Sequence, residues 1–303
     1  MSPFLYPALA AAVVAISFAA VLVRLSASPP AVLAAYRLLL SALAAAPWAW
    51  WNLRRHPFPG AKAASLSLIA GAVLGLHYAL WFASLERTSI ASSTVLVTLH
   101  PLFVIPASYF LRRERFSARS LFGAALALAG GAAVGWGDFS LGRESLAGDL
   151  LAVAAALCVA VHFMIAARVR EKTPVGIFAA ATYAAGAAVL FAAAALSSPE
   201  ELWPRPAREW AIYLALALLP TFVGHTLFTW ALRYTSPAVV SVSILGEPVG
   251  ASILALLFFG EVPRAVQLVG GALVLGGVYL FVTGRRTKAA EKGRAPGDEE
   301  RQE

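Results

Sequence analysis

Residues 243–261 of the chain read SILGEPVGASILALLFFGE. Glu247 is the only charged residue between Tyr234 and Gly260, with thirteen uncharged residues on either side of it. A stretch of about 20 apolar residues is long enough to cross a bilayer as a helix. A charged side chain at the centre of such a helix costs about 2.5–3.5 kcal/mol on insertion scales. The stretch therefore predicts a membrane helix whose single carboxyl group is kept for a function or for a buried hydrogen bond.

The rest of the chain repeats this pattern of long uncharged runs. The 303 residues are 60% hydrophobic and 13% charged, with a mean hydropathy of +0.74, whereas soluble domains carry about 25% charged residues. We predict an all-α integral membrane protein with ten transmembrane helices and no soluble domain beyond a polar tail at residues 285–303. The predicted spans are Met1–Val23, Leu25–Leu53 (which contains Arg37), Ala63–Leu85, Thr88–Leu111, Ser120–Gly137, Leu150–Ala167, Thr173–Pro199, Trp210–Leu232, Tyr234–Gly260 and Ala265–Gly284.

The distribution of Lys and Arg between the loops predicts the orientation. If the N-terminus is cytoplasmic, seventeen of these residues lie on the cytoplasmic side and six on the outer side. Both termini are therefore expected in the cytoplasm of a bacterial-type inner membrane. The net charge of +8 is explained by contact with anionic lipid, without a nucleic-acid partner. The first segment lacks a basic n-region, so we interpret it as an uncleaved helix rather than a secretory signal.

An internal repeat emerges when the chain is compared with itself at an offset of 147 residues. The offset aligns Thr88-Ser89 with Thr235-Ser236, Pro101 with Pro248, Glu114 with Glu261 and Gly123 with Gly270. We therefore predict two five-helix repeats, residues 1–137 and 150–284, joined by a loop at 138–149. Because five is odd, the second repeat enters the membrane from the opposite side. Inverted-topology repeats are typical of transporters that bind substrate near the bilayer midplane.

Glycines and prolines mark packing and breaks in the predicted spans. Spans five and ten are glycine-rich, and small residues let membrane helices approach closely. We assign a packing role to Gly123, Gly130, Gly131, Gly270, Gly271, Gly276 and Gly277. Prolines interrupt spans four, eight and nine and release backbone carbonyls there; they are Pro101, Pro106, Pro220 and Pro248.

The sequence resembles the EamA-type exporters of the drug/metabolite transporter superfamily. The segments that carry the resemblance are LGEPVGASILALLFFGE (Leu245–Glu261), its partner LHPLFVIPASYFLRRE (Leu99–Glu114), ALRYTSPAVVS (Ala231–Ser241) and Arg37. The resemblance implies ten helices in two inverted repeats and the export of a small metabolite. Within that family the sequence looks most like amino-acid exporters of the YddG type. The first repeat departs from the pattern because His100 stands where the second carries Glu247.

Glu247 is the first candidate site residue. It is interpreted either as the group that receives a substrate ammonium or a proton, or as a structural carboxyl that bonds a neighbouring helix. Ser243, one turn back, extends a small polar stripe on the same face if the helix is continuous.

Four of the five histidines fall within spans: His77, His100, His162 and His225. None is spaced for a metal-ligand pair, so we expect no metal and no cofactor. The offset aligns His100 with Glu247 and Tyr78 with His225, as expected if both pairs line a shared cavity. Tyr78 and Trp81 lie beside His77 and suggest an aromatic wall. Packing between helices is the alternative for all of these side chains.

Arg37 lies early in span two, and two interpretations stay open for it. The side chain extends to the lipid headgroups, or it holds a substrate carboxylate.

These features predict an alternating-access exporter of small metabolites, most simply amino acids including aromatic ones. Drugs, sugars or nucleotide precursors are alternative substrates on the same fold. An intramembrane enzyme is a poor alternative because no GxSxG motif and no aspartate occurs within a span. Inverted halves also fit a rocking carrier better than a static channel. Two fused halves make a monomer self-sufficient in principle.

Overall fold

A computed structural model describes residues 4–57, 59–88, 90–135, 143–197, 199–203, 206–260, 262 and 265–284. All regular secondary structure within these residues is helical. Eight helical segments of the described chain are long and apolar enough to cross a membrane. Two shorter apolar helices, Ala118–Ala133 and Leu268–Thr283, stand at the fifth and tenth predicted spans. The prediction of ten spans is therefore confirmed for eight, while the other two are apolar helices of shorter length. The predicted polar tail at 285–303 and most of the loop at 138–149 lie outside the described residues.

The elements follow the chain in one long series. In the first half they are α1 (Leu5–Leu25), α2 (Pro30–Arg55), α3 (Ala61–Leu85), α4 (Ile90–Thr98), α5 (Pro101–Arg112) and α6 (Ala118–Gly135). In the second half they are α7 (Arg143–Arg170), α8 (Val175–Ser197), the 3₁₀ turn η2 (Pro199–Glu201), α9 (Ala207–Leu216), the π-helix η3 (Ala217–His225), α10 (Thr226–Ala231), α11 (Pro237–Ile244), α12 (Glu247–Phe259) and α13 (Ala265–Thr283).

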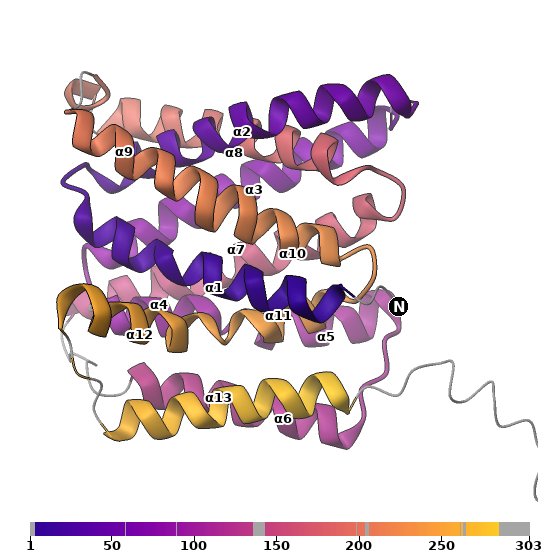
Figure 1. The fold of residues 1–303 in the computed structure, drawn as a ribbon, viewed down its shortest axis with the longest axis vertical. Helices are drawn as coiled ribbons and strands as arrows, with labels where there is room; N and C mark the ends of the chain where they lie inside the picture. The colour runs from indigo at the N-terminus through magenta and orange to yellow at the C-terminus, as the bar shows by residue number, and fades with distance from the viewer. Residues whose placement is uncertain are drawn as a thin grey trace, which may run out of the picture.

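The helices run side by side, and those of the two halves alternate through the bundle (Figure 1). Helix α2 packs on α8, α3 packs on both α7 and α8, and α6 packs on α13. The α6–α13 pair forms one edge of the bundle, and α2, α8 and α9 form the other. Helices α5 and α12 lie at opposite ends of one layer. The central helices α1, α3, α7 and α10 therefore lie between these edges.

Two membrane segments are broken near their centres. Helix α4 ends at Thr98 and α5 begins at Pro101, while α11 ends at Ile244 and α12 begins at Glu247. A proline in the first turn of a helix lacks only an N–H that has no intrahelical partner, and Pro101 and Pro248 each occupy that position. The third break is the π-helix η3, which contains Pro220. Pro106 lies inside α5 without ending it.

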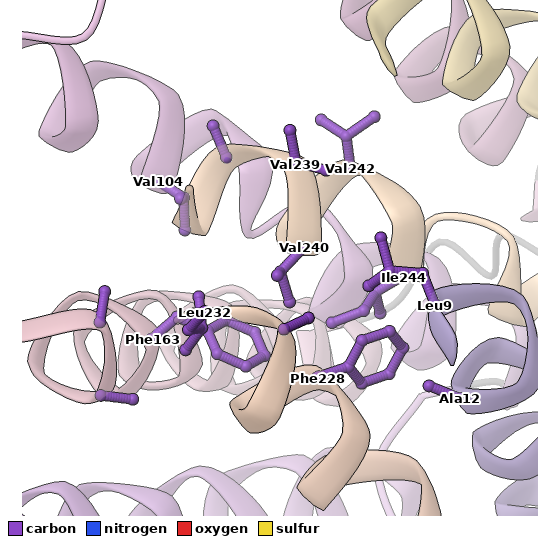
Figure 2. Close-up of a cluster of buried hydrophobic side chains, with 14 of the residues drawn as sticks. Leu9, Ala12, Val104, Phe163, Phe228, Leu232, Val239, Val240, Val242 and Ile244 are labelled. Atoms are coloured by element: carbon purple, nitrogen blue, oxygen red, sulfur yellow. The ribbon is translucent and has the colours of Figure 1, made fainter. Parts of the chain in front are cut away.

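The core beside these breaks is apolar. Figure 2 shows Val240 of α11 pointing toward Leu232 and Phe228, which are 4% and 0% exposed. Val239 and Val242 point to the other side of the same short helix. All eight residues of α11 are buried, so protein surrounds this helix on every side.

The glycine-rich helices α6 and α13 are in close contact, as their small residues predict. A Cβ on Gly123 would lie 2.5 Å from the backbone nitrogen of Phe281, and one on Gly277 would lie 2.5 Å from that of Ala127. Both distances are shorter than a van der Waals contact, so only glycine fits. Gly131 and Gly276 differ, because a Cβ there would meet nothing within 4 Å. The close approach therefore depends on one glycine face of each helix.

Candidate functional site

A small cavity of about 40 Å³ lies where the two broken segments meet the central helices. Polar side chains from both halves of the chain line it: Arg37, His77, Tyr78, Trp81, Thr98, His100, His225 and Glu247. A single water needs about 10–15 Å³ of such volume, whereas pockets for drug-sized ligands measure about 300–1,000 Å³. In this conformation the cavity is thus large enough for a few waters and closed to an amino acid.

Glu247 is the first residue of α12 and is partly exposed, on the wall of the cavity. The N-terminus of a helix carries a partial positive charge that stabilises a carboxylate. No hydrogen bond or ion pair joins its carboxylate to another of the described side chains. The carboxylate is therefore held by the helix break and remains available to a ligand.

Arg37 is buried in the middle of the bundle and is only 1% exposed. This burial excludes the interpretation in which its side chain extends to the headgroups. Its Nε donates a hydrogen bond of 2.6 Å to Thr221 Oγ1 of η3, and its guanidinium lies 4.5 Å from the centroid of the Tyr78 ring. A cation over an aromatic face is attracted by the ring quadrupole. Both contacts fix the guanidinium on the wall of the cavity.

Tyr78 and His225 join the two halves of the chain at the cavity. Tyr78 Oη lies 3.0 Å from Nε2 of His225. Tyr78 belongs to α3 and is 1% exposed, so its hydroxyl depends on this partner. Arg37, Tyr78 and His225 therefore form a connected chain of polar groups from α2 through α3 to η3.

His77 and His162 hold α3 and α7 together. His77 Nδ1 lies 2.9 Å from the carbonyl oxygen of Ala155 on α7, and His162 Nδ1 lies 3.0 Å from that of Ala70 on α3. A carbonyl only accepts, so Nδ1 is the donor in both rings, which leaves Nε2 as an acceptor when the ring is neutral. His77 lines the cavity and His162 does not.

His100 lies at the break between α4 and α5. It precedes Pro101 at the N-cap of α5, and its Nδ1 lies 2.7 Å from the hydroxyl of Ser241 on α11. The bond ties the break between α4 and α5 to the short buried helix α11. His100 therefore both lines the cavity and positions the two broken segments relative to one another.

Ser243 lies outside the cavity. Its hydroxyl donates to the carbonyl oxygen of Val239, at 2.8 Å, within α11. The polar stripe expected through Ser243 and Glu247 does not form, because the turn at residues 245–246 separates α11 from α12. Gly250 instead faces α1, where an added Cβ would lie 2.1 Å from Ser17 Oγ.

The structure thus brings seven of the nine sequence candidates together and leaves Ser243 and His162 outside the cavity. Two further residues that were not predicted from the sequence also line the cavity. Thr98 ends α4 and Phe163 lies on α7. Thr98 directly precedes the Leu-His-Pro break, a signal that was available in the sequence, whereas no local signal distinguishes Phe163 from the other apolar residues of α7. No group of three or more His, Cys, Asp or Glu side chains suited to a metal occurs in the described part of the chain.

Known proteins are similar to this chain over most of its length. A sequence profile of the EamA-like transporter family matches residues 2–136 and again residues 146–283. An "Aromatic amino acid exporter YddG" of Ancylobacter novellus is 27% identical over 214 residues, which cover 68% of this chain and 71% of the relative. A "Probable terminal-alkyne amino-acid exporter" of Streptantibioticus cattleyicolor is 29% identical over 207 residues, covering 67% and 68% of the two chains. An "Uncharacterized transporter" of Archaeoglobus fulgidus is 26% identical over 205 residues, covering 68% and 72%.

A solved crystal structure shows the same fold. It superposes with a TM-score of 0.76 at 22% identity, over 93% of this chain and 97% of the other. Together with the profile matches to both halves, this makes the chain a multi-pass membrane protein with the fold and sequence of a transporter. It belongs to the EamA-like transporter family.

Proposed function

We propose that the protein exports small metabolites, and most simply amino acids, by alternating access to the central cavity. The observation that carries the proposal is that Glu247 and Arg37 both line one cavity at the helix breaks. Ionisable residues inside a membrane protein are costly and mark substrate or ion pathways. A carboxylate and a guanidinium on one cavity fit a small polar metabolite better than an apolar drug.

The arrangement of the helices supports alternating access. Ten spans in two inverted repeats would let the halves exchange conformations around a fixed midplane site. Two observations favour this topology: the equivalent helices α6 and α13 pack together, as do α2 and α8, and the breaks near His100 and Glu247 are separated by the repeat offset. The two repeats are assigned to residues 1–137 and 150–284, joined at 138–149 and followed by the tail. Both termini are assigned to the cytoplasmic side of the inner membrane.

Substrate must enter by movement of helices, because the cavity of about 40 Å³ does not hold an amino acid. The breaks at α4–α5 and α11–α12 provide flexible points for such movement. The cycle needs no cofactor and no covalent step, and one monomer contains both halves of the cavity. Small-molecule transport is thus favoured over catalysis.

The test is counterflow in proteoliposomes loaded with one unlabelled amino acid at a time and supplied outside with its labelled form. We expect saturable exchange for at least one amino acid, and a loss of about tenfold or more in the Glu247→Gln protein, because a charge-assisted bond of about 1.5–3 kcal/mol is removed. Glu86→Gln is the matched control, since Glu86 is exposed at the end of α3. Exchange of drugs or sugars without any amino-acid exchange would redirect the assignment to those substrates.

A further inference from the structure

Two buried donors on the wall of the cavity have no acceptor. They are Nη1 of Arg37 and the indole Nε1 of Trp81, on side chains that are 1% and 6% exposed. Buried donors without partners are rare in native proteins and call for an explanation. We propose that Arg37 and Trp81 form a carboxylate subsite in the same cavity as Glu247, so that the transported molecule is a zwitterion with one carboxylate and one ammonium group. This inference rests on the proposed function and assigns its substrate-binding contacts.

The guanidinium of Arg37 has no close anionic partner among the described residues. A buried charge is retained only when it is paired or hydrogen-bonded. Its Nε donates a hydrogen bond to Thr221, and the guanidinium plane lies over the ring of Tyr78. Its Nη1 has no hydrogen-bond acceptor in the part of the chain that the structure describes. No ion pair within 4.0 Å joins Arg37 to Glu247 in the described structure. The guanidinium therefore has a free donor and no described carboxylate within ion-pair distance.

Trp81 supplies the second donor from the same surface. It lies on α3 one turn beyond Tyr78, the residue that carries Arg37 on its ring. Its ring is fixed by Phe82, with centroids 5.1 Å apart, and by His77, with centroids 6.1 Å apart. An indole N–H only donates, so it too needs an acceptor. A carboxylate has two acceptor oxygens and can satisfy both groups at once.

Charge balance identifies the class of molecule. Arg37 and Glu247 are the one permanent cation and the one acidic group among the described residues that line the cavity. A molecule with one carboxylate and one ammonium neutralises both, whereas a free phosphate would leave an excess of negative charge and an organic cation would leave Arg37 unpaired. The remaining wall is apolar, formed by Ile16, Ala19, Val97, Val159, Phe163 and Ile244. A transported molecule with an apolar or aromatic side chain would fit against that surface.

The experiment compares three ligands that share one side chain: phenylalanine, phenylalaninamide, which lacks the carboxylate, and N-acetylphenylalanine, which lacks the ammonium. Each competes with labelled phenylalanine or leucine in counterflow by the full-length protein. We expect phenylalanine to compete about tenfold or more better than its amide, because the amide cannot form charge-assisted bonds to Arg37 and Trp81.

The variants assign the subsite. Trp81→Phe keeps the ring and removes the donor, and Arg37→Gln removes the charge; both should reduce the preference for the acid over the amide to within about threefold. Glu247→Gln should instead reduce the preference for free over N-acetylated phenylalanine. If Arg37→Gln fails to fold in detergent, Trp81→Phe alone tests whether the subsite binds the carboxylate.

The outcomes separate the two proposals. If the wild-type protein gives no saturable exchange with any amino acid, the proposed function fails. If it exchanges amino acids but the amide competes equally, or if Trp81→Phe leaves the preference unchanged, the donors bind only water and the subsite is overturned.

Discussion

Tyr78 and His225 are separated by 147 residues, the offset of the internal repeat, and their side chains meet at 3.0 Å in the centre of the bundle. Residues at equivalent positions of two repeats come into contact when both lie close to the axis that relates the halves. Tyr78 also contacts Arg37, whose guanidinium lies 4.5 Å from the centroid of the Tyr78 ring. The bond therefore couples the two halves at the point where a substrate would bind.

Tyr78→Phe isolates that bond from the cation–π contact. The ring under Arg37 is retained, while His225 loses its partner. Interhelical side-chain hydrogen bonds in membrane proteins contribute about 0.6 kcal/mol on average and up to about 1.7 kcal/mol. We expect a loss of that size in the free energy of unfolding in detergent, together with weaker amino-acid binding. Since His225→Phe breaks the same bond, the double variant should lose less than the sum of the two single losses. Fully additive losses would show that the two residues do not interact.

His77 and His162 form a matched pair for separating packing from binding. Each donates through Nδ1 to a carbonyl across the α3–α7 interface, but only His77 lines the cavity. His77→Phe and His162→Phe should therefore lose similar stability, about 0.6–1.7 kcal/mol, while only His77→Phe changes the KM for amino-acid counterflow. Equal shifts of KM in both variants would contradict the division of roles.

The sequence predicts which residues lie within a membrane span better than it predicts which side of the helix a residue faces. The spans follow from runs without charge, because lipid forces every backbone group into a helix. Most observed helices begin and end close to the predicted limits, but α7 (Arg143–Arg170) starts seven residues before its predicted span. Arg37 and Glu247 were identified for the same reason. Ser243 was placed beside Glu247 by assuming one continuous helix, and the turn at residues 245–246 removes that relationship.

Some charges that the sequence assigns to loops are buried in the structure. Arg170 is 2% exposed and donates to the carbonyl oxygens of Thr229 and Thr173. Glu209 is 5% exposed and accepts hydrogen bonds from the segment between α1 and α2. Both depend on tertiary contacts between distant segments, which no local pattern encodes. The π-helix η3 was likewise indicated only by Pro220.

Glu209 should hold the connection between α1 and α2 in place. Its carboxylate accepts bonds from Ser26 Oγ at 2.5 Å, from the Ala27 amide at 3.1 Å and from Ser28 Oγ at 2.8 Å. Glu209→Ala removes all three, and hydrogen bonds to a charged group contribute about 1.5–3 kcal/mol each. We expect faster hydrogen exchange of the amides of residues 26–28 and lower stability. The neighbouring Arg208→Ala, which loses one exposed bond to the Leu25 carbonyl, is the control; unchanged exchange in Glu209→Ala would show that the loop is held by other contacts.

The glycines of α6 and α13 provide a test of close packing with controls in the same two helices. Gly123→Ala and Gly277→Ala place a Cβ within 2.5 Å of backbone nitrogens, so the helices must separate, at a cost of about 1–3 kcal/mol. Gly131→Ala and Gly276→Ala meet nothing within 4 Å and should be neutral or stabilising by up to about 1 kcal/mol, since alanine is the better helix former. The stability of all four variants is measured by thermal unfolding in detergent, monitored through the labelling of the single cysteine, Cys158. Similar effects at all four positions would mean that helix propensity, rather than contact, sets their stability.

The direction in which the two halves cross the membrane is open to a direct measurement. Helices α5 and α12 end at opposite ends of the bundle (Figure 1), and an exposed residue follows each of them, Arg115 and Val262. In a Cys158→Ala background, Arg115→Cys should react with a membrane-impermeant maleimide only from the cytoplasmic side, and Val262→Cys only from the outer side. Labelling in intact cells measures accessibility from the outer side, and labelling in inverted vesicles measures accessibility from the cytoplasmic side. Lys62→Cys, at the same end as Arg115, calibrates the cytoplasmic signal. Labelling of Arg115→Cys and Val262→Cys from the same side would rule out the inverted repeat. It would also remove the basis for alternating access, because halves inserted in the same sense cannot convert an inward-open cavity into an outward-open one by exchanging conformations.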